Sequence, residues 1–261
     1  MAALQQLTLN RGQLVERFAY DRYPRSSQYD PAWVLENQMG PNALWLVEAL
    51  SDMMEFRSGM RILDLGCGKA MTSIFLAREF GARVWATDLW IPARENWSRI
   101  TAAGVADRVF PVHAEARSLP YADGFLDAIV GLDAYHYFGT DVHYLEFHLL
   151  RLVKPDGPIG IVSPASPCEL PDPFPAHLDP ADWYWLNSVE WWRRHWARSP
   201  GQVERAELLP GGWEDWRRWR DLQHDVGALA GRPSTEKERA ELHADGGRHL
   251  GFVRMVGRRT A

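Results

Sequence analysis

The hydrophobic pattern from Met60 to Val162 alternates between two periods. Short apolar runs bounded by turn residues are typical of buried strands, and apolar residues at helical spacing are typical of helices that cover a sheet. We expect strands at 61–65, 83–88, 108–115, 125–133 and 158–163, with helices at 71–81, 93–104 and 140–153 between them. This alternation predicts parallel βαβ units with right-handed crossovers and helices on both faces of the sheet.

The flanks of this stretch have a different pattern. Before it, residues 42–56 (NALWLVEALSDMMEF) read as an amphipathic helix, and a polar, tyrosine-rich loop at 18–33 precedes that helix. After it, residues 164–182 hold six prolines and predict an irregular crossing of the fold. Further helices are expected at 188–199 and 213–226, and further strands at 202–210 and 249–259. The pattern indicates one domain with a lid-like insertion after the fifth strand.

Composition narrows the class of protein. A chain of 261 residues is long enough for one sizeable core and a small cap. The net charge of -5 argues against a nucleic-acid-binding surface. No stretch resembles a signal peptide or a membrane span, so a cytoplasmic location is the expectation. Most of the 13 tryptophans lie beyond Asp182, in the region that follows the proline-rich segment.

We expect neither a disulfide nor a metal site. Cys67 and Cys168 are far apart and form no CxxC pattern. His143 and His148 are five residues apart, which is not the i, i+4 spacing that puts two ligands on one helix face. Cys67 stands between two glycines with no histidine near it in sequence to form a thiolate pair, so a small residue in a tight loop is the better interpretation than a nucleophile.

The turn after the first strand carries the main chemical signal. It reads Asp64-Leu-Gly66-Cys67-Gly68, and the glycines allow a ligand to approach the main chain closely. A dinucleotide site would have a third glycine where Met71 stands. Asp64 would repel a pyrophosphate but attract the ammonium group of an amino acid, directly or through water. The turn therefore disfavours NAD.

Two further acids follow the next two strands. Asp88 ends the second strand, 24 residues after Asp64, where it can accept hydrogen bonds from both hydroxyls of a ribose. Glu115 follows the third strand and could accept from an adenine amino group, while the N–H of Ala116 could meet the ring. The amino acid, ribose and base contacts together predict S-adenosylmethionine (SAM) as the ligand.

These motifs resemble a known family. The residues RILDLGCG, the acid ending the second strand, LPYADGFLDAI and LVKPDGPIGI are similar to those of class I SAM-dependent methyltransferases of the small-molecule type, which include quinone, sterol and amine methyltransferases and cyclopropane fatty acid synthases. The resemblance covers about residues 58–163 and departs from the pattern at Glu115 and Lys69. It implies a Rossmann-like, seven-stranded, mostly parallel sheet with an antiparallel last strand.

The resemblance also implies that four segments of the chain have different roles. Residues 1–58 would form a helical leader over the cofactor, 59–163 the SAM-binding core, 164–200 a tryptophan-rich lid at the acceptor pocket, and 201–261 the rest of the sheet with an inserted helix. His136 and Tyr20 are the catalytic candidates, although His136 could equally be structural and the tyrosines could simply pack. The expected cofactor-binding residues are Asp64, Gly66, Cys67, Gly68, Asp88, Leu89, Glu115, Ala116, Leu132, Asp133 and Tyr23.

The expected activity is methyl transfer from SAM to a small-molecule acceptor. An enzyme that cyclises or cleaves SAM, and a module that binds SAM without turnover, would carry the same motifs and remain alternatives. An aromatic wall of tryptophans could hold either a flat acceptor or a cationic one. The acceptor, the atom methylated and the oligomeric state are left open.

Overall fold

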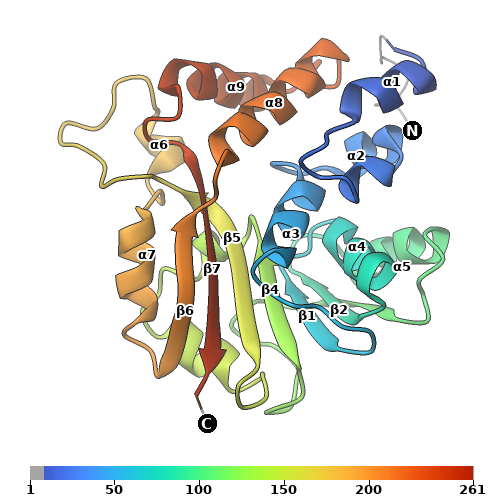
Figure 1. Ribbon diagram of the computed structural model, residues 1–261, viewed down its shortest axis with the longest axis vertical. Coiled ribbons are helices and arrows are strands. Elements are labelled where there is room, and N and C mark those ends of the chain that lie inside the picture. Colours follow the sequence, from blue (N-terminus) through green and yellow to red (C-terminus); the bar gives the residue numbers. More distant parts are fainter. Residues whose placement is uncertain (1–8, 261) are drawn as a thin grey trace.

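The computed structural model describes residues 9–260, and their core is a seven-stranded sheet (Figure 1). The strand order is β3-β2-β1-β4-β5-β7-β6. Strand β7 pairs antiparallel with both neighbours, and the pairs among β1 to β5 are parallel. This confirms the expected Rossmann-like sheet with its antiparallel last strand. The bounds are β1 (Arg61–Leu65), β2 (Arg83–Asp88), β3 (Val109–His113), β4 (Ala128–Leu132), β5 (Pro158–Ala165), β6 (Gly201–Leu208) and β7 (Gly251–Arg259).

Successive side chains along the strands pack alternately in two separate hydrophobic cores, one on each face of the sheet. Ile62 of β1 packs in a core with α3 (Ala43–Ser51) and α4 (Met71–Phe80), while its neighbour Leu63 packs in another core on the opposite face. Because successive strand residues point to opposite faces, both faces must be covered. Helix α5 (Ala93–Ala102) covers β3 on the first side. The second side is covered by η4, a π-helical segment (Leu145–Leu150), and by α7 (Val189–Trp196).

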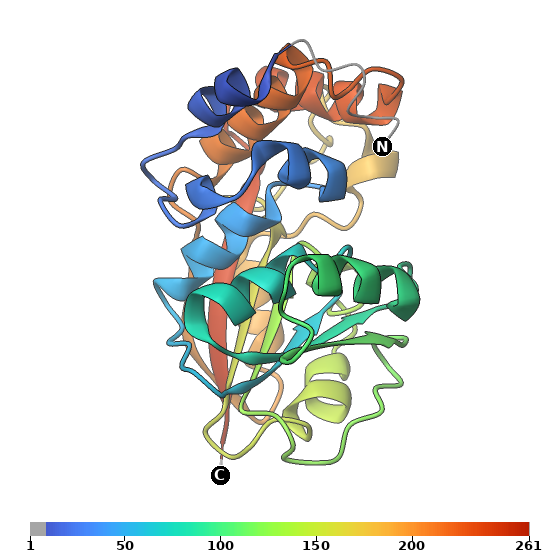
Figure 2. The same ribbon diagram turned by 90° about the vertical axis from the view of Figure 1, so that its right-hand side faces the viewer.

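Four helices form a cap at one end of the sheet, seen at the top of both views (Figure 2). They are α1 (Arg11–Phe18), α2 (Pro31–Asn37), α8 (Gly212–Asp225) and α9 (Pro233–Asp245), with the short α6 (Pro180–Trp183) beside them. The two ends of the chain are tied together here, since Phe18 packs edge-on against Trp219 with ring centroids 5.9 Å apart. None of the helices described is long and apolar enough to cross a membrane.

Two expected elements are shorter or placed differently from the prediction. The helix expected at 140–153 is reduced to η4, because Asp141 turns the chain by accepting from His143 N at 3.0 Å and Val153 already pairs with Leu126 in a bridge. The lid expected at 164–200 includes α7, but α7 lies on the sheet. Its Trp192 and Trp196 are fully buried there against Tyr135, each with ring centroids 5.7 Å from it.

The leader and the lid therefore need new boundaries. Residues 1–8 of the expected leader lie outside the described part of the chain. The cap combines leader helices with α8 and α9, which come from the region assigned to completion of the sheet. Helix α9 was not predicted at all, although Pro233 at its first turn and Gly246 after its last residue are ordinary helix boundary signals.

Candidate active site

A cavity of about 570 Å³ lies between the sheet and the cap. We call the turns that follow β1, β2 and β3 its floor, and we call residues 182–185 with the lining residues of α8 and α9 its roof. The turn after β4 joins the two, because Ala134 lies against Gly66 of the floor and the His136 ring lies 4.3 Å from the Trp185 ring of the roof. Parallel sheets with helical crossovers bind ligands at this end of their strands.

The glycine turn of the floor is shaped for close approach. Gly66 and Gly68 have φ angles of 74° and 53°, in the left-handed region that favours glycine. A Cβ on Gly66 would come within 2.4 Å of the Ala134 Cβ, so no larger residue fits without displacing the turn after β4. The turn is held to β2 by Gly66 N and Cys67 N, which donate to the Thr87 carbonyl at 2.9 and 3.1 Å.

Asp64 lies behind this turn and does not line the cavity. Its Oδ2 accepts from the Ser73 hydroxyl at 2.6 Å and from the Thr72 hydroxyl, which joins β1 to the start of α4. Its Oδ1 is buried with no hydrogen-bond partner among residues 9–260. Burial raises the pKa of Asp64 to about 6. The side chain thus has a structural role that the sequence did not indicate, and its contact with a ligand ammonium group stays a prediction.

Asp88 lines the floor and organises it. Its Oδ2 accepts from Gly68 N at 2.8 Å, and its Oδ1 accepts from Trp90 N and Ile91 N at 2.7 and 2.8 Å. An ionised carboxylate has about four acceptor positions, so one remains for a ligand hydroxyl. The sequence predicted bonds to both ribose hydroxyls, whereas the geometry leaves room for one.

The other predicted floor residues reach the same cavity. Leu89, Glu115 and Ala116 all line it. The Glu115 carboxylate accepts from Arg117 N at 2.7 Å and pairs with the Arg117 guanidinium at 3.2 Å, so it is partly neutralised. Cys67 also lines the cavity, and burial raises the pKa of its thiol. A thiol held protonated is a poor nucleophile, in agreement with its interpretation as a small loop residue.

The turn after β4 brings three predicted residues to the cavity: Leu132, Asp133 and His136. His136 is buried, its Nδ1 lies 3.1 Å from the Ser163 hydroxyl, and burial lowers its pKa to about 3. A ring with so low a pKa is a weak general base. Asp133 has a φ of 53°, unusual for a residue other than glycine, and burial raises its pKa to about 8, with nearby Glu238 adding to the effect.

The structure does not bring Tyr20 and Tyr23 to the cavity, contrary to the roles expected for them. Their hydroxyls donate to the two carboxylate oxygens of Asp215 on α8, at 2.8 and 2.6 Å. Buried phenols need a hydrogen-bond partner, and a buried carboxylate on the facing helix supplies one. The leader reaches the cavity instead through residues 37–43, including Met39 and Gly40.

The roof was largely missed by sequence reasoning. The sequence indicated only that tryptophans beyond Asp182 could form an aromatic wall, and Trp183, Trp185 and Trp216 are the ones that reach the cavity. No pattern pointed to the polar residues between them. All of the following line the roof: Asp182, Trp183, Trp185, Trp216, Arg220, Ser234, Thr235, Glu238 and Glu241. The i, i+3 spacing of Glu238 and Glu241 is the signal that places both on one face of α9.

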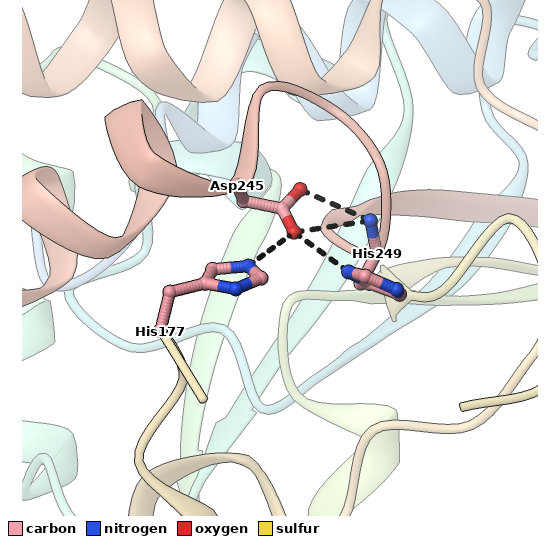
Figure 3. A group of neighbouring side chains, drawn as sticks. All are labelled: His177, Asp245 and His249. Atoms are coloured by element: carbon pink, nitrogen blue, oxygen red, sulfur yellow. Dashed lines mark hydrogen bonds and ion pairs between the residues drawn. The ribbon is translucent and has the colours of Figure 1, made fainter. Parts of the chain in front are cut away.

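A group able to hold a metal ion lies outside the cavity, although none was expected. His177, Asp245 and His249 come from the segment before α6, the end of α9 and the loop before β7, and both imidazoles face the carboxylate (Figure 3). The carboxylate is already used, because it accepts from His177 Nε2 at 2.9 Å, from His249 Nδ1 at 3.1 Å and from His249 N and Leu250 N. These bonds join α9 to β7 and the proline-rich segment.

Comparison with known proteins is consistent with this geometry. Residues 62–157 match a family profile described as a methyltransferase domain. The methyltransferase GfsG of Streptomyces halstedii is 27% identical over 59% of this chain and 52% of its own length. The demethylmenaquinone methyltransferase of Clavibacter sepedonicus is 35% identical over 54% of this chain and 56% of its own. The chain thus spans about half the length of these relatives.

The likeness in fold extends over nearly the whole chain. The crystal structure of a protein from Galdieria sulphuraria, described as a putative sarcosine dimethylglycine methyltransferase, covers 94% of this chain and 92% of its own with a TM-score of 0.66. At 19% identity this shows a shared fold and no more. Residues 62–157 thus resemble a methyltransferase domain, and the chain as a whole shares the fold of that solved structure.

Proposed function

We propose that this chain transfers the methyl group of SAM to a small-molecule acceptor by in-line displacement. The observation that carries the proposal is the Asp64–Gly68 turn, whose glycines line a cavity. The opposite side of that cavity, the roof, is lined by tryptophans and carboxylates. When bound, SAM supplies a methyl group on a positively charged sulfur. The floor would hold the cofactor, and the roof would hold the acceptor.

The floor fits such a cofactor on three counts. Gly66 and Gly68 present bare main chain where a Cβ would fill the space. Asp88 keeps one acceptor position for a ribose hydroxyl, and Glu115 and Ala116 lie where the base is expected. Asp64 lies behind the turn with a buried Oδ1 that has no partner in the described part of the chain, and an ammonium group could satisfy it through water.

Rate acceleration in this site would come mainly from placement. Holding an acceptor next to a reactive group supplies roughly 7–11 kcal/mol of the barrier in well-oriented cases. A cavity of about 570 Å³ is within the usual range for small-molecule sites. The cap covers it, and exclusion of water by such a cover protects the reaction. The names of the curated relatives, all methyltransferases, support the same reaction type.

The test is turnover with SAM labelled in its methyl group. The purified chain is incubated with a panel of amines, phenols, carboxylic acids and thiols, and products are read by mass spectrometry. We expect S-adenosylhomocysteine and a methylated acceptor in equal amounts. Methylthioadenosine as the product would instead support cleavage of SAM. Binding of SAM without any product across the panel would support a non-catalytic module.

A further inference from the structure

Five aromatic rings form a continuous row along the roof and the turn after β4. From α8 toward β4 they are Trp216, Trp183, Trp185, His136 and Tyr137, with successive ring centroids 5.7, 5.6, 4.3 and 4.0 Å apart. All five line the cavity. The indole N–H groups of Trp183 and Trp216 donate to Glu241 and Glu238 at 2.9 and 2.6 Å. The tryptophan rings are therefore fixed in place by the carboxylates beside them.

The carboxylates of this region outnumber the cations. Glu238 is paired with the Arg220 guanidinium at 2.8 Å, and Asp182 at the edge is paired with Lys237 at 2.8 Å. Glu241 is buried, accepts only from the neutral donors Asp179 N and Trp183 Nε1, and forms no ion pair within the described part of the chain.

Asp133 is the second carboxylate without an ion pair among the described residues, although the Arg220 guanidinium is near enough to lower its pKa in part. Its side chain has no hydrogen bond and no ion pair with any described residue, although it lines the cavity. Its Oδ2 lies directly over Gly40, where an added Cβ would come within 2.4 Å. A left-handed φ is uncommon for a residue other than glycine, and such conformations often occur at functional positions. The carboxylate thus lies at the cavity with no hydrogen bond or ion pair from residues 9–260.

Glu241 and Asp133 indicate what kind of ligand would fit beside them. Burying a carboxylate without a cation is costly, and the cost falls when a cation binds beside it. Aromatic faces attract the same cation through their quadrupoles. An uncharged flat acceptor would satisfy the rings but leave Asp133 and Glu241 unpaired, and an anionic acceptor would be repelled by both.

We propose that the methyl acceptor is a cationic amine, held by Glu241 and the aromatic row and deprotonated by Asp133. The inference rests on the proposed methyl transfer. A proton leaves the ammonium nitrogen for an Asp133 carboxylate oxygen, and the freed lone pair forms the nitrogen–carbon bond. The carbon–sulfur bond breaks, its electron pair stays on sulfur, and the methylated ammonium product carries the charge. The proton on Asp133 is released to solvent when the product leaves.

The first experiment measures binding without turnover. Tryptophan fluorescence of the full chain, saturated with S-adenosylhomocysteine, is titrated with choline and with its uncharged isostere, in which a tert-butyl group replaces trimethylammonium. We expect choline to quench the fluorescence and to bind at least about tenfold more tightly than the isostere. Equal affinities would overturn the proposal.

Matched variants on α9 locate the cation. Glu241→Gln should weaken choline binding about tenfold, whereas Glu236→Gln on the same helix, outside the cavity and bonded to His224, should leave it unchanged. An unchanged affinity in Glu241→Gln contradicts the assignment. Affinity for SAM is measured on every variant by calorimetry. If SAM binds and amines do not, only the amine inference fails, and if SAM does not bind, the proposed function fails as well.

The role of Asp133 needs a readout that a structural role would not give. In Asp133→Asn, turnover of a secondary amine should fall at least about a hundredfold while the dissociation constant of S-adenosylhomocysteine stays within about threefold. We expect wild-type activity to rise with pH near pH 8, where Asp133, faced by Glu238 and Arg220, loses its proton, and we expect the variant to lose this rise. A variant that loses cofactor affinity and keeps amine binding would show that Asp133 serves the cofactor instead.

Discussion

Asp88 in the floor of the cavity and Glu241 in its roof are held in different ways. Asp88 in the floor accepts three main-chain N–H groups and so fixes the turns around it. Glu241 in the roof accepts two neutral donors and lies beside indole rings, with no ion pair among the residues described. Asp88 thus mainly stabilises the turns of the floor, whereas Glu241 remains able to pair with a cationic ligand. This difference distinguishes the floor, which would bind the cofactor, from the roof, which would determine acceptor specificity.

Loss of Asp88 should have the largest effect, because it removes both the ligand contact and the support of the floor. In Asp88→Ala three main-chain donors lose their partner and the ribose bond is lost. We expect SAM affinity to fall at least about a hundredfold, measured by calorimetry. Asp107→Ala is the matched control, since its exposed carboxylate pairs with the neighbouring Arg108 and lies outside the cavity. An unchanged dissociation constant in Asp88→Ala would separate the floor from cofactor binding altogether.

Replacing Gly66 by alanine should have the second-largest effect on SAM affinity. Gly66→Ala strains a φ of 74° and drives a Cβ toward Ala134. Gly124→Ala has a similar φ of 62° but opens into free space, so it carries the backbone strain alone. We expect the first variant to lose about tenfold in SAM affinity beyond the second, and to lose more unfolding free energy than the roughly 1 kcal/mol that backbone strain costs the second. Equal affinities would mean that the turn does not approach the ligand.

The Asp133→Asn variant tests the comparison of floor and roof through the free energy of unfolding, because Asp133 lies in the turn that joins the two. Its folded pKa of about 8 lies above the ordinary value of 3.8, so the folded chain binds the extra proton between these limits. Wild-type stability from this group therefore declines as pH rises from about 4 to 8. Asparagine carries no charge and tolerates a positive φ.

The unfolding free energy of Asp133→Asn relative to wild type should thus grow with pH. We expect little difference near pH 4 and a gain of about 1–3 kcal/mol near pH 9, measured by denaturant titration across that range. A difference that stays constant with pH would show that the carboxylate does not carry the burial cost assigned to it.

The leader contact should show the smallest effect on ligand binding. Tyr23→Phe removes a buried hydrogen bond to Asp215, so we expect a loss of about 1.5–3 kcal/mol in unfolding free energy. Because Tyr23 does not line the cavity, SAM affinity should stay within about threefold. Tyr20→Phe, at the other Asp215 oxygen and less buried, should cost less. A large loss of SAM affinity with unchanged stability would restore the cofactor role that the sequence suggested.

The floor could be predicted from the sequence because local rules determine it. The glycines of the first turn and the acids at strand ends follow from the strand pattern, and a parallel sheet brings those ends to one edge. Gly66, Gly68, Asp88, Glu115 and their neighbours consequently reach the cavity as expected.

The roof could not be predicted in this way, since it depends on contacts between distant segments. Trp183, Trp216 and Glu241 come from three separate elements, and only the packing of α6, α8 and α9 brings them together. Tyr20 and Tyr23 show the same limit from the other side. Their partner, Asp215, is more than 190 residues away in the sequence, and no local pattern links them.

The central claim is best tested by calorimetric titration of the purified chain with SAM, S-adenosylhomocysteine and NAD in parallel. We predict micromolar binding of the two sulfur compounds and none of NAD. If neither sulfur compound binds, the Asp64–Gly68 turn serves another ligand or only the fold, and the proposed methyl transfer is contradicted together with every role assigned to the floor.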